Sequence, residues 1–274
     1  MIKIGFVTCV KLGLSCMEAI YSNGGNLNLV ITLKDDMGVK KSGRIYLDEF
    51  CKLHNIDLHK CNHINESNCI DIIKLKQIDW LFIIGWSQIA SNEILSSTNL
   101  GVIGAHPTLL PKGRGRASIP WAIIKKLNKT GVTLFKLDKG VDTGAIIDQI
   151  EIPMHDNINA TELYEAINQA HVNLIDTVIP KLLSNSIKLT EQNNLNATHW
   201  PGRKPEDGEI DLNGSVHDAE LLIRAVTYPY PGAFTYHKNK KLIIWKAKIR
   251  EISNHNCLRF KDGFLELIDF EFQD

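Results

Sequence analysis

The sequence predicts an α/β fold in which helices cover a mainly parallel sheet, followed by a small β-rich part at the C-terminus. Short apolar, β-branched segments alternate with helical segments over residues 2–183, as expected for parallel strands joined by crossover helices. Residues 80–85 form a continuous apolar run, which is typical of a strand buried on both faces. From about residue 190 the chain becomes polar and rich in turn-forming residues. These observations predict a Rossmann-like domain over residues 1–189 and a β-rich C-terminal subdomain over residues 190–274.

Each expected element is identified from its apolar pattern and from the turn residues beside it. The strands expected in the first domain are residues 2–7, 27–33, 56–60, 80–85, 101–104, 131–137 and 145–152. The expected helices are residues 16–23, 42–54, 70–77, 93–97, 119–126 and 160–183. In the C-terminal subdomain, residues 242–245, 258–260 and 264–270 are expected to form strands. Parallel strands in this order require right-handed crossovers.

Composition narrows the class of partner. The 31 basic residues equal the 31 acidic residues, so nothing indicates a surface built for nucleic-acid phosphates or anionic lipid. The 6 cysteines are scattered without a C-x-x-C pair, and the histidines show no metal-ligand spacing. The N-terminus has no signal-peptide pattern, and no segment has the roughly 18 apolar residues of a membrane span. We therefore expect a cytoplasmic, unprocessed protein with reduced thiols and no metal.

The first segment that carries chemistry is residues 104–117, Gly-Ala-His-Pro-Thr-Leu-Leu-Pro-Lys-Gly-Arg-Gly-Arg-Ala. His106 follows the expected strand 101–104, and open α/β sheets bind ligands at the carboxyl ends of their strands. The prolines and glycines after it predict an irregular loop that can wrap around a flat heterocycle. A single histidine after a strand is more often structural, so His106 needs a partner to be interpreted as catalytic.

The second segment, residues 138–144, reads Asp-Lys-Gly-Val-Asp-Thr-Gly between two apolar strands. On its own, Asp142 is most simply a turn residue. Beside His106, however, its carboxylate would fix the orientation of the imidazole and suit it to acid–base catalysis near neutral pH.

Together the two segments resemble the folate-dependent formyltransferases, whose motif is Asn-x-His, a Ser/Thr-Leu-Leu-Pro loop and a later Asp-Thr-Gly turn. The resemblance runs from residue 2 to about residue 249 and implies an enzyme that uses N10-formyltetrahydrofolate as formyl donor. It implies that His106 is the acid–base group and Asp142 its orienting carboxylate. The residues expected to hold the folate, largely through main-chain groups, are Trp86, Gln88, Ile89, Ala90, Leu109, Arg116, Asp138, Lys139, Gly140, Val141 and Asp142. A buried core role explains Trp86 equally well.

The C-terminal segments 203–211, 222–226 and 228–234 are similar to those of the sugar N-formyltransferases, and residues 104–116 resemble the pseudaminic-acid-pathway type. This resemblance implies a nucleotide-linked amino sugar as acceptor, expected to be a UDP-linked 4-amino-4,6-dideoxy sugar for cell-surface glycan or flagellin. Lys11, Arg203 and Arg224 are candidates for binding its diphosphate, and analogy suggests a homodimer. The alternatives are an enzyme like methionyl-tRNA formyltransferase, a formyltetrahydrofolate hydrolase and a non-catalytic folate-binding module.

Gly104 departs from the family motif, because it stands where the family has asparagine, two residues before the histidine. Losing one donor to an oxyanion costs a rate factor on the order of 10²–10³. Another group can replace this amide, the glycine can make room for a substrate that approaches differently, or catalysis is lost. We favour the second explanation and therefore count Gly104 among the candidate catalytic positions.

Overall fold

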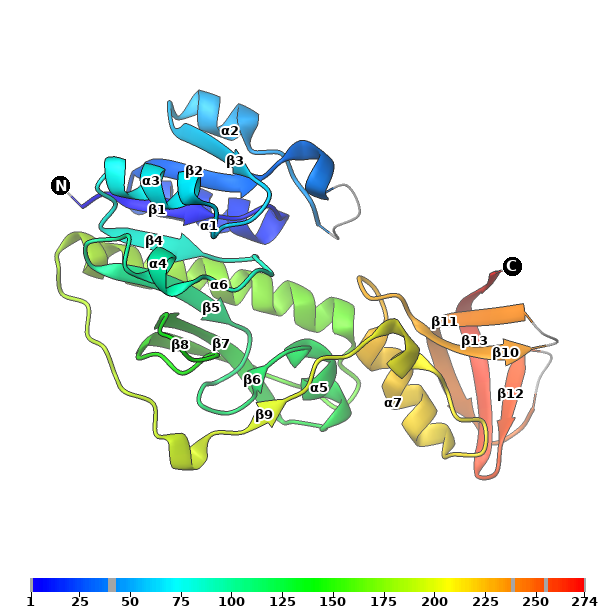
Figure 1. Cartoon of the computed structure of the whole chain (residues 1–274). Coiled ribbons are helices and arrows are strands. Elements are labelled where there is room, and N and C mark those ends of the chain that lie inside the picture. The colour runs from blue at the N-terminus through cyan, green and yellow to red at the C-terminus, as the bar shows by residue number, and fades with distance from the viewer. Residues whose placement is uncertain (1, 39–42, 238–239, 254–255, 274) are drawn as a thin grey trace. The chain divides into compact units, whose positions relative to one another are not determined.

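The computed structural model describes residues 2–38, 43–237, 240–253 and 256–273 (Figure 1). The chain divides into two compact units, and each is described by itself. The first comprises Met1–Arg114, Gly131–Glu151 and Ile167–Thr198, and the second comprises Gly115–Thr130, Ile152–Ala166 and His199–Asp274. The division predicted from the sequence, at residues 189 and 190, remains a prediction.

A seven-stranded sheet with the order β3-β2-β1-β4-β5-β7-β8 forms the centre of the first unit. Its strands are β1 (Ile4–Val7), β2 (Leu27–Leu33), β3 (Asp57–Cys61), β4 (Trp80–Ile83), β5 (Gly101–His106), β7 (Lys129–Lys136) and β8 (Ile146–Pro153). The pairs from β3 through β5 are parallel, and β7 runs antiparallel to β5. The prediction of a Rossmann-like, mainly parallel sheet is confirmed.

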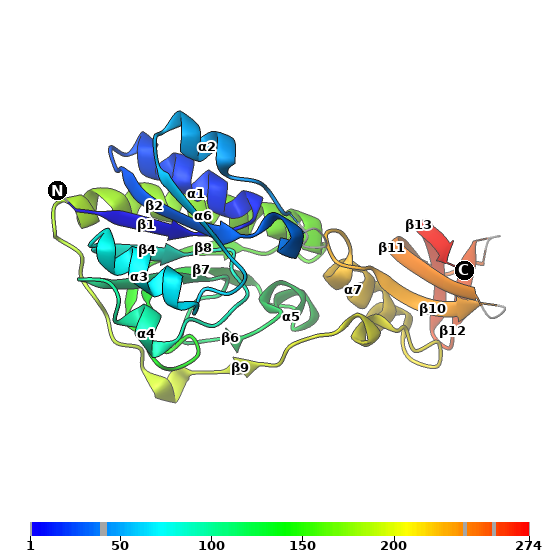
Figure 2. The same ribbon diagram turned by 45° about the horizontal axis from the view of Figure 1, so that its top comes forward.

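Helices cover both faces of this sheet (Figure 2). On one face, α3 (Ser67–Leu75) and α4 (Asn92–Leu95) join a buried cluster with Val7 and Leu81 of the strands. One residue along each strand, Phe6 and Phe82 point to the opposite face and stack at 5.8 Å, as the two-residue period of a strand requires. That face carries α1 (Lys11–Ser22) and α6 (Ala160–Leu183), which are linked by a hydrogen bond of 2.6 Å from Asn23 to Asp176.

The helix predicted at residues 42–54 is shorter than expected. A short 3₁₀ helix, η1 (Asp35–Gly38), follows β2, and α2 spans only Asp48–Leu53, while residue 42 lies outside the described residues. The Arg44 guanidinium donates to Thr32 Oγ1 at 3.2 Å and to the Leu33 carbonyl at 2.8 Å, and Arg44 also forms a β-bridge with Val10. These long-range contacts hold the segment extended, which a local helical pattern cannot reveal.

The second unit contains a four-stranded antiparallel sheet with the order β10-β11-β13-β12, which confirms the predicted β-rich subdomain. Its strands are β10 (Ala233–His237), β11 (Lys240–Arg250), β12 (Cys257–Phe260) and β13 (Gly263–Gln273). Its helices are α5 (Ser118–Ile124), the 3₁₀ helix η3 (Pro205–Gly208) and α7 (Val216–Val226). The sequence did not predict α7. The remaining elements are the strand pair β6 (Arg114–Gly115) and β9 (His199–Trp200), and the 3₁₀ helix η2 (Asn194–Asn196).

Two features are absent from the described residues. None of their helices is long and apolar enough to span a bilayer. The same residues contain no group of three or more His, Cys, Asp or Glu side chains that could hold a metal ion. All 6 cysteines are free thiols.

Candidate active site

The structure brings His106 and Asp142 together in the first unit, although 36 positions separate them in the sequence. His106 is the last residue of β5, and its Nδ1 lies 3.6 Å from Oδ2 of Asp142. The two side chains are only 9% and 17% exposed, so the pair is largely shielded from water. On the other side of the ring, Nε2 is 2.8 Å from the Gly113 carbonyl. Because a carbonyl can only accept, Nε2 carries a proton in this contact, and Nδ1 is the atom that faces the carboxylate.

The loop that follows His106 is anchored by Thr133, a fully buried residue of β7. Its hydroxyl donates to the Thr108 carbonyl at 2.7 Å and accepts from the Leu110 N–H at 3.1 Å. The Gln149 amide donates both to this hydroxyl, at 2.7 Å, and to the Leu110 carbonyl, at 2.9 Å. The loop therefore has a fixed backbone path despite its irregular sequence.

Asp142 lies in a loop whose shape depends on side-chain hydrogen bonds. Asp138 Oδ1 accepts from the Gly140 N–H at 3.0 Å and from the Thr143 hydroxyl at 2.6 Å. Asp142 itself has a φ of 55°, in the left-handed region that asparagine and aspartate tolerate better than most residues. The loop thus turns sharply at the residue whose carboxylate faces His106.

Gly104 lies two residues before His106, and Leu137 occupies the space beside it. A Cβ at position 104 would stand 2.5 Å from Leu137 Cδ2 and 3.2 Å from Leu137 Cγ. The room left by the missing side chain is therefore filled by protein in this structure. A substrate could use that room only after Leu137 had moved, which weighs against the explanation that we favoured from the sequence.

The predicted folate-binding segment, residues 86–90, follows β4 and is fastened to the loop after β3. Gln88 accepts from the Ile64 N–H at 2.9 Å and donates to the Asn62 carbonyl at 2.8 Å. Asn65 donates to the Ile89 carbonyl at 3.0 Å and accepts from the Ser91 N–H at 2.9 Å. The Gln88 side chain is thus engaged within the protein, while that of Ile89 is 73% exposed.

The same segment borders the Gly104 region. Trp86, Ala90 and Leu137 all pack against the buried cluster beneath α3 and α4. Leu109 lies against Gly131 of β7. The ends of strands β4 and β5 and the loop after β7 therefore lie next to one another in the first unit.

The predicted anion-binding residues are not brought together within one unit. Lys11 begins α1 in the first unit, whereas Arg203 and Arg224 belong to the second. Arg203 donates to the Asp207 carbonyl at 2.6 Å, and its guanidinium lies 5.2 Å from the centre of the Trp121 ring. Arg116, which the resemblance assigns to folate binding, also belongs to the second unit, and its side chain is exposed.

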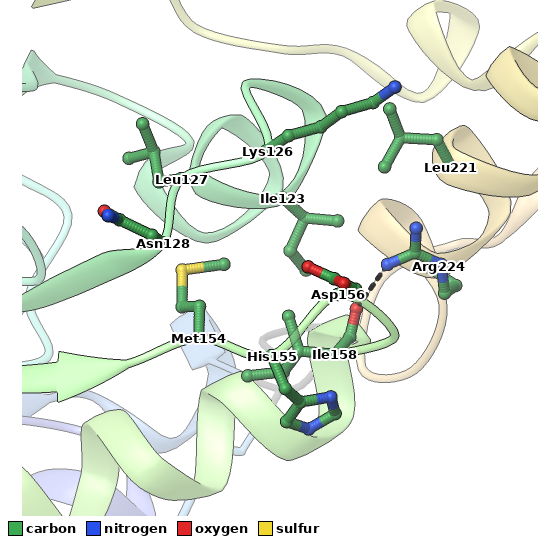
Figure 3. Close-up of a pocket in the computed structure, with 10 residues that line it drawn as sticks. All are labelled: Ile123, Lys126, Leu127, Asn128, Met154, His155, Asp156, Ile158, Leu221 and Arg224. Carbon is green, nitrogen blue, oxygen red and sulfur yellow. Dashed lines mark hydrogen bonds between the residues drawn. The ribbon is translucent and has the colours of Figure 1, made fainter.

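Arg224 borders a pocket of about 300 Å³ in the second unit (Figure 3). Its guanidinium donates to the Ile158 carbonyl at 2.8 Å and pairs with Glu220 at 2.7 Å. The pocket is lined by Ile123, Lys126, Leu127, Asn128, Met154, His155, Asp156, Ile158, Leu221 and Arg224. Both of these Arg224 contacts lie within its own unit.

Several residues that shape the site gave no signal in the sequence. They are polar residues of loops and strands, and their partners lie far away along the chain: Asn65, Arg114, Thr133, Gln149, Gln192 and Thr198. A hydroxyl or amide at such a position has no local partner that the sequence would indicate. Only the fold shows that it binds a particular backbone group.

The fold and the pair of His106 and Asp142 define an α/β protein with a candidate acid–base site at the carboxyl end of a central strand. Comparison with known families narrows this class. Residues 11–179 match the formyl transferase family and residues 203–264 match the formyl transferase C-terminal domain. The chain belongs to the formyl transferase family, and the family predicted from the sequence is confirmed.

Among characterised relatives, the chain is 33% identical over 247 residues to the bifunctional polymyxin resistance protein ArnA of Wigglesworthia glossinidia brevipalpis. The match covers 90% of this chain but 36% of ArnA, so the chain spans about a third of that relative's length. Among solved structures, WlaRD, described as a sugar 3N-formyl transferase and solved with dTDP and 5-N-formyl-THF, superposes with a TM-score of 0.72 at 24% identity, covering 97% of this chain and 96% of WlaRD.

Two further structures extend the likeness across the whole chain. An N-formyltransferase from Helicobacter canadensis, in complex with folinic acid and dTDP-3-aminofucose, has a TM-score of 0.72 at 21% identity and covers 99% of this chain and 100% of its own. Methionyl-tRNA formyltransferase from Clostridium thermocellum has a TM-score of 0.67 at 19% identity and covers 100% of both chains. At these identities the structural likeness establishes the fold.

Proposed function

We propose that this protein transfers a formyl group from N10-formyltetrahydrofolate to the primary amine of a nucleotide-linked amino sugar. The observation that carries the proposal is the shielded contact of 3.6 Å between the His106 imidazole and the Asp142 carboxylate at the end of β5. The family match supports formyl transfer as the reaction. WlaRD and the Helicobacter canadensis enzyme, which share the fold, were solved with folate-type ligands and with dTDP or a dTDP-linked amino sugar.

In the proposed reaction the neutral amine attacks the formyl carbon, a new carbon–nitrogen bond forms and the bond from that carbon to N10 breaks. One proton leaves the attacking nitrogen and one reaches N10. His106 accepts the first and delivers the second through Nε2, whose contact with the Gly113 carbonyl opens for the transfer, while Asp142 holds the ring in place from the Nδ1 side. Positioned acid–base groups of this kind contribute a factor on the order of 10²–10⁴ to the rate.

Gly104 provides no amide for the oxyanion of the tetrahedral intermediate. In our proposal the positive charge of protonated His106 takes over this role, because the imidazole is held by Asp142 on one side and by the Gly113 carbonyl on the other. His106 would then stabilise charge as well as move the proton.

The proposed acceptor is a 4-amino-4,6-dideoxy sugar linked to UDP, of the kind used in pseudaminic-acid-type glycan or flagellin modification. The resemblance of residues 104–116 supports this choice, whereas the two structural relatives named above point to dTDP as a competing nucleotide. A net charge of zero disfavours tRNA as the acceptor. Lys11, Arg203 and Arg224 remain the proposed contacts for the diphosphate.

The test is to incubate the protein with N10-formyltetrahydrofolate and a panel of UDP- and dTDP-linked amino sugars, and to analyse the products by mass spectrometry. A formamide on one sugar supports the proposal. Free formate without a formamide indicates a hydrolase, formylated methionyl-tRNA in a parallel reaction indicates the tRNA enzyme, and folate binding without turnover indicates a non-catalytic module.

The His106 assignment has its own test. His106→Ala is expected to lower kcat by a factor of 10² or more. His217→Ala, at an exposed histidine of α7, is the control that should keep wild-type kcat. Equal activity of His106→Ala and the wild type would overturn the acid–base assignment.

The proposal includes a homodimer in the cytoplasm. Two large apolar side chains on one face of β13, Ile268 and Phe272, are each 50% exposed. Apolar groups of this size on a sheet surface suit a self-complementary interface. Free thiols at all 6 cysteines are compatible with a reducing compartment. Sedimentation equilibrium of the wild type and of Phe272→Lys would test the dimer, which the lysine should weaken.

A further inference from the structure

The Gln192 side chain lies between the loop of Asp142 and Arg114. Its Nε2 donates to two main-chain carbonyls of that loop, those of Asp142 at 2.9 Å and Gly144 at 2.7 Å. Its Oε1 accepts from Arg114 Nε at 3.2 Å and Nη2 at 2.7 Å. All four residues belong to the first unit, so this network lies within one compact part of the chain.

The chemistry of the partners fixes which way the Gln192 amide points. A guanidinium has only donors, and a main-chain carbonyl has only lone pairs. The amide oxygen must therefore face Arg114, and the amide nitrogen must face the two carbonyls. Arg114 is 3% exposed and its Nη2 is also bonded to Asn194 Oδ1 at 2.8 Å, so it cannot turn away easily. Arg114 thus holds Gln192 in the one orientation that can bind the loop.

The loop needs such support at Asp142. Its φ of 55° is a conformation that residues with a Cβ adopt only when the surroundings hold them there. The two carbonyls that Gln192 binds belong to Asp142 itself and to the glycine two positions later, so the hydrogen bonds span the turn. These bonds fix the backbone from which the Asp142 carboxylate reaches His106.

The segment that carries Gln192 also holds the other side of His106. Residues 190–198 include Thr198, whose hydroxyl accepts from the Gly113 N–H at 2.8 Å and whose carbonyl accepts from the Arg114 N–H at 2.9 Å. Gly113 is the residue whose carbonyl contacts Nε2 of His106. One segment therefore fixes both groups that contact the imidazole, the carboxylate on one side and the carbonyl on the other.

We propose that Gln192 is a positioning residue for formyl transfer: it sets the Asp142 carboxylate against His106, and Arg114 orients it for this task. The proposal rests on the proposed function, because it acts through the pair of His106 and Asp142. Gln192 touches neither substrate in this proposal. Its effect is to keep the two catalytic side chains in the geometry that proton transfer requires.

Gln192→Glu is the sharpest test. Glutamate has the same size and keeps the contact with Arg114, but it loses the two N–H donors and places a carboxylate oxygen against two carbonyls. We expect kcat to fall on the order of 10- to 100-fold, the loss associated with a small displacement of catalytic groups, while KM for both substrates changes less than about 3-fold. The pH profile of kcat should also change. A rise in KM without a fall in kcat would overturn the proposal.

A matched control makes the same chemical change elsewhere. Gln169 is exposed on α6 and donates to Asn173 Oδ1 at 2.9 Å. Gln169→Glu should keep wild-type kcat and pH profile. If Gln192→Glu fails to fold, Gln192→Met serves instead, since it removes the donors without adding a charge. It should show the same loss of kcat, and wild-type kcat in Gln192→Met would also overturn the proposal.

A double-variant cycle separates this proposal from the proposed function. If Gln192 acts through Asp142, then adding Gln192→Glu to Asp142→Asn should lower kcat by less than about 2-fold beyond Asp142→Asn alone. If the kcat of the double variant is lowered by the product of the two single-variant factors, the positioning role is overturned. If Asp142→Asn is inactive while Gln192→Glu is fully active, only the Gln192 proposal is overturned. If Asp142→Asn is fully active, the proposed acid–base pair of His106 and Asp142 is overturned.

Discussion

Leu137 fills the space that a side chain at Gly104 would need, because a Cβ at position 104 would lie 2.5 Å from Leu137 Cδ2. Real Cβ atoms essentially never approach another heavy atom so closely. The glycine and the leucine therefore belong together. A side chain at position 104 therefore requires the Leu137 side chain to move.

The first prediction concerns this pair. Gly104→Asn should lower the free energy of unfolding by about 1–3 kcal/mol, since the new side chain forces Leu137 to move. It should not raise kcat, because Leu137 stands where the amide must go. Adding Leu137→Ala should make room for the new side chain and raise kcat above that of Gly104→Asn alone. Urea unfolding and kcat for the four proteins of the cycle measure both effects. If Gly104→Asn alone raised turnover steeply with an unchanged product, Leu137 would not occupy space that the amide needs.

The second prediction concerns Thr133→Val, which keeps the shape of the side chain and removes its hydroxyl. The Leu110 N–H loses its acceptor and the Thr108 carbonyl loses its donor, and each orphaned buried group costs about 1–3 kcal/mol. Because these groups fix the loop after His106, kcat should fall on the order of 10-fold or more. Denaturant unfolding and steady-state kinetics check the two effects.

Thr177→Val is the control for this change. Thr177 donates to the Asn173 carbonyl at 2.9 Å on the exposed side of α6, where water can replace the hydroxyl. It should alter stability by less than about 0.5 kcal/mol. A Thr133→Val protein as stable and active as this control would show that the buried hydroxyl does not hold the loop.

The sequence predicted the sheet well because its signals are local. The apolar run of residues 80–85 corresponds to β4 (Trp80–Ile83), and the motif after residue 101 places His106 at the end of β5. The roles of His106 and Asp142 came from the resemblance, and the structure adds their contact of 3.6 Å.

The contacts that fix the site are not local, and the sequence did not indicate them. Gln192 reaches a loop 48 and 50 residues away, and Arg44 is held extended by two residues of β2 where the local pattern favours helix. The sequence predicted no element over α7, although its apolar residues are spaced for a helix. Long-range hydrogen bonds of this kind become visible only when the fold brings the partners together.

The third prediction concerns the N-terminus of α7. The Ser215 hydroxyl accepts from the His217 N–H at 3.2 Å and so caps the helix. It also donates to Oδ2 of Asp262, in the turn between β12 and β13, at 2.7 Å. Ser215→Ala should destabilise the protein by about 1 kcal/mol, the usual cost of losing an N-cap. Since the Ser215 side chain contacts Asp262 and the His217 N–H and neither His106 nor Asp142, kcat should stay within about 2-fold of the wild type. Thermal unfolding and kinetics test this, and a large loss of kcat at full stability would contradict it.

The fourth prediction concerns His171, a residue of α6 that is 3% exposed. Burial lowers the pKa of its imidazole to about 4, the hydrogen bond of 2.7 Å to the Ile167 carbonyl opposes this shift, and the charge of His106 adds to it. An unfolded histidine titrates near 6.5, so between about pH 6.5 and 4 the unfolded state binds more protons than the folded state. The stability that neutral His171 contributes is therefore complete above about pH 6.5 and is lost as the pH falls toward 4.

The prediction compares the pH dependence of the free energy of unfolding in two proteins, because carboxylates titrate in both and also change the stability. Between pH 7 and pH 5 the wild type should lose about 2 kcal/mol more stability than His171→Leu, which has no proton to bind at this position. His217→Leu, at an exposed histidine, should follow the wild type across the same range. Urea unfolding of the three proteins at both pH values measures the difference. If His171→Leu and the wild type lose stability in parallel, the buried imidazole does not oppose protonation, and His171 is not held neutral beside the active site.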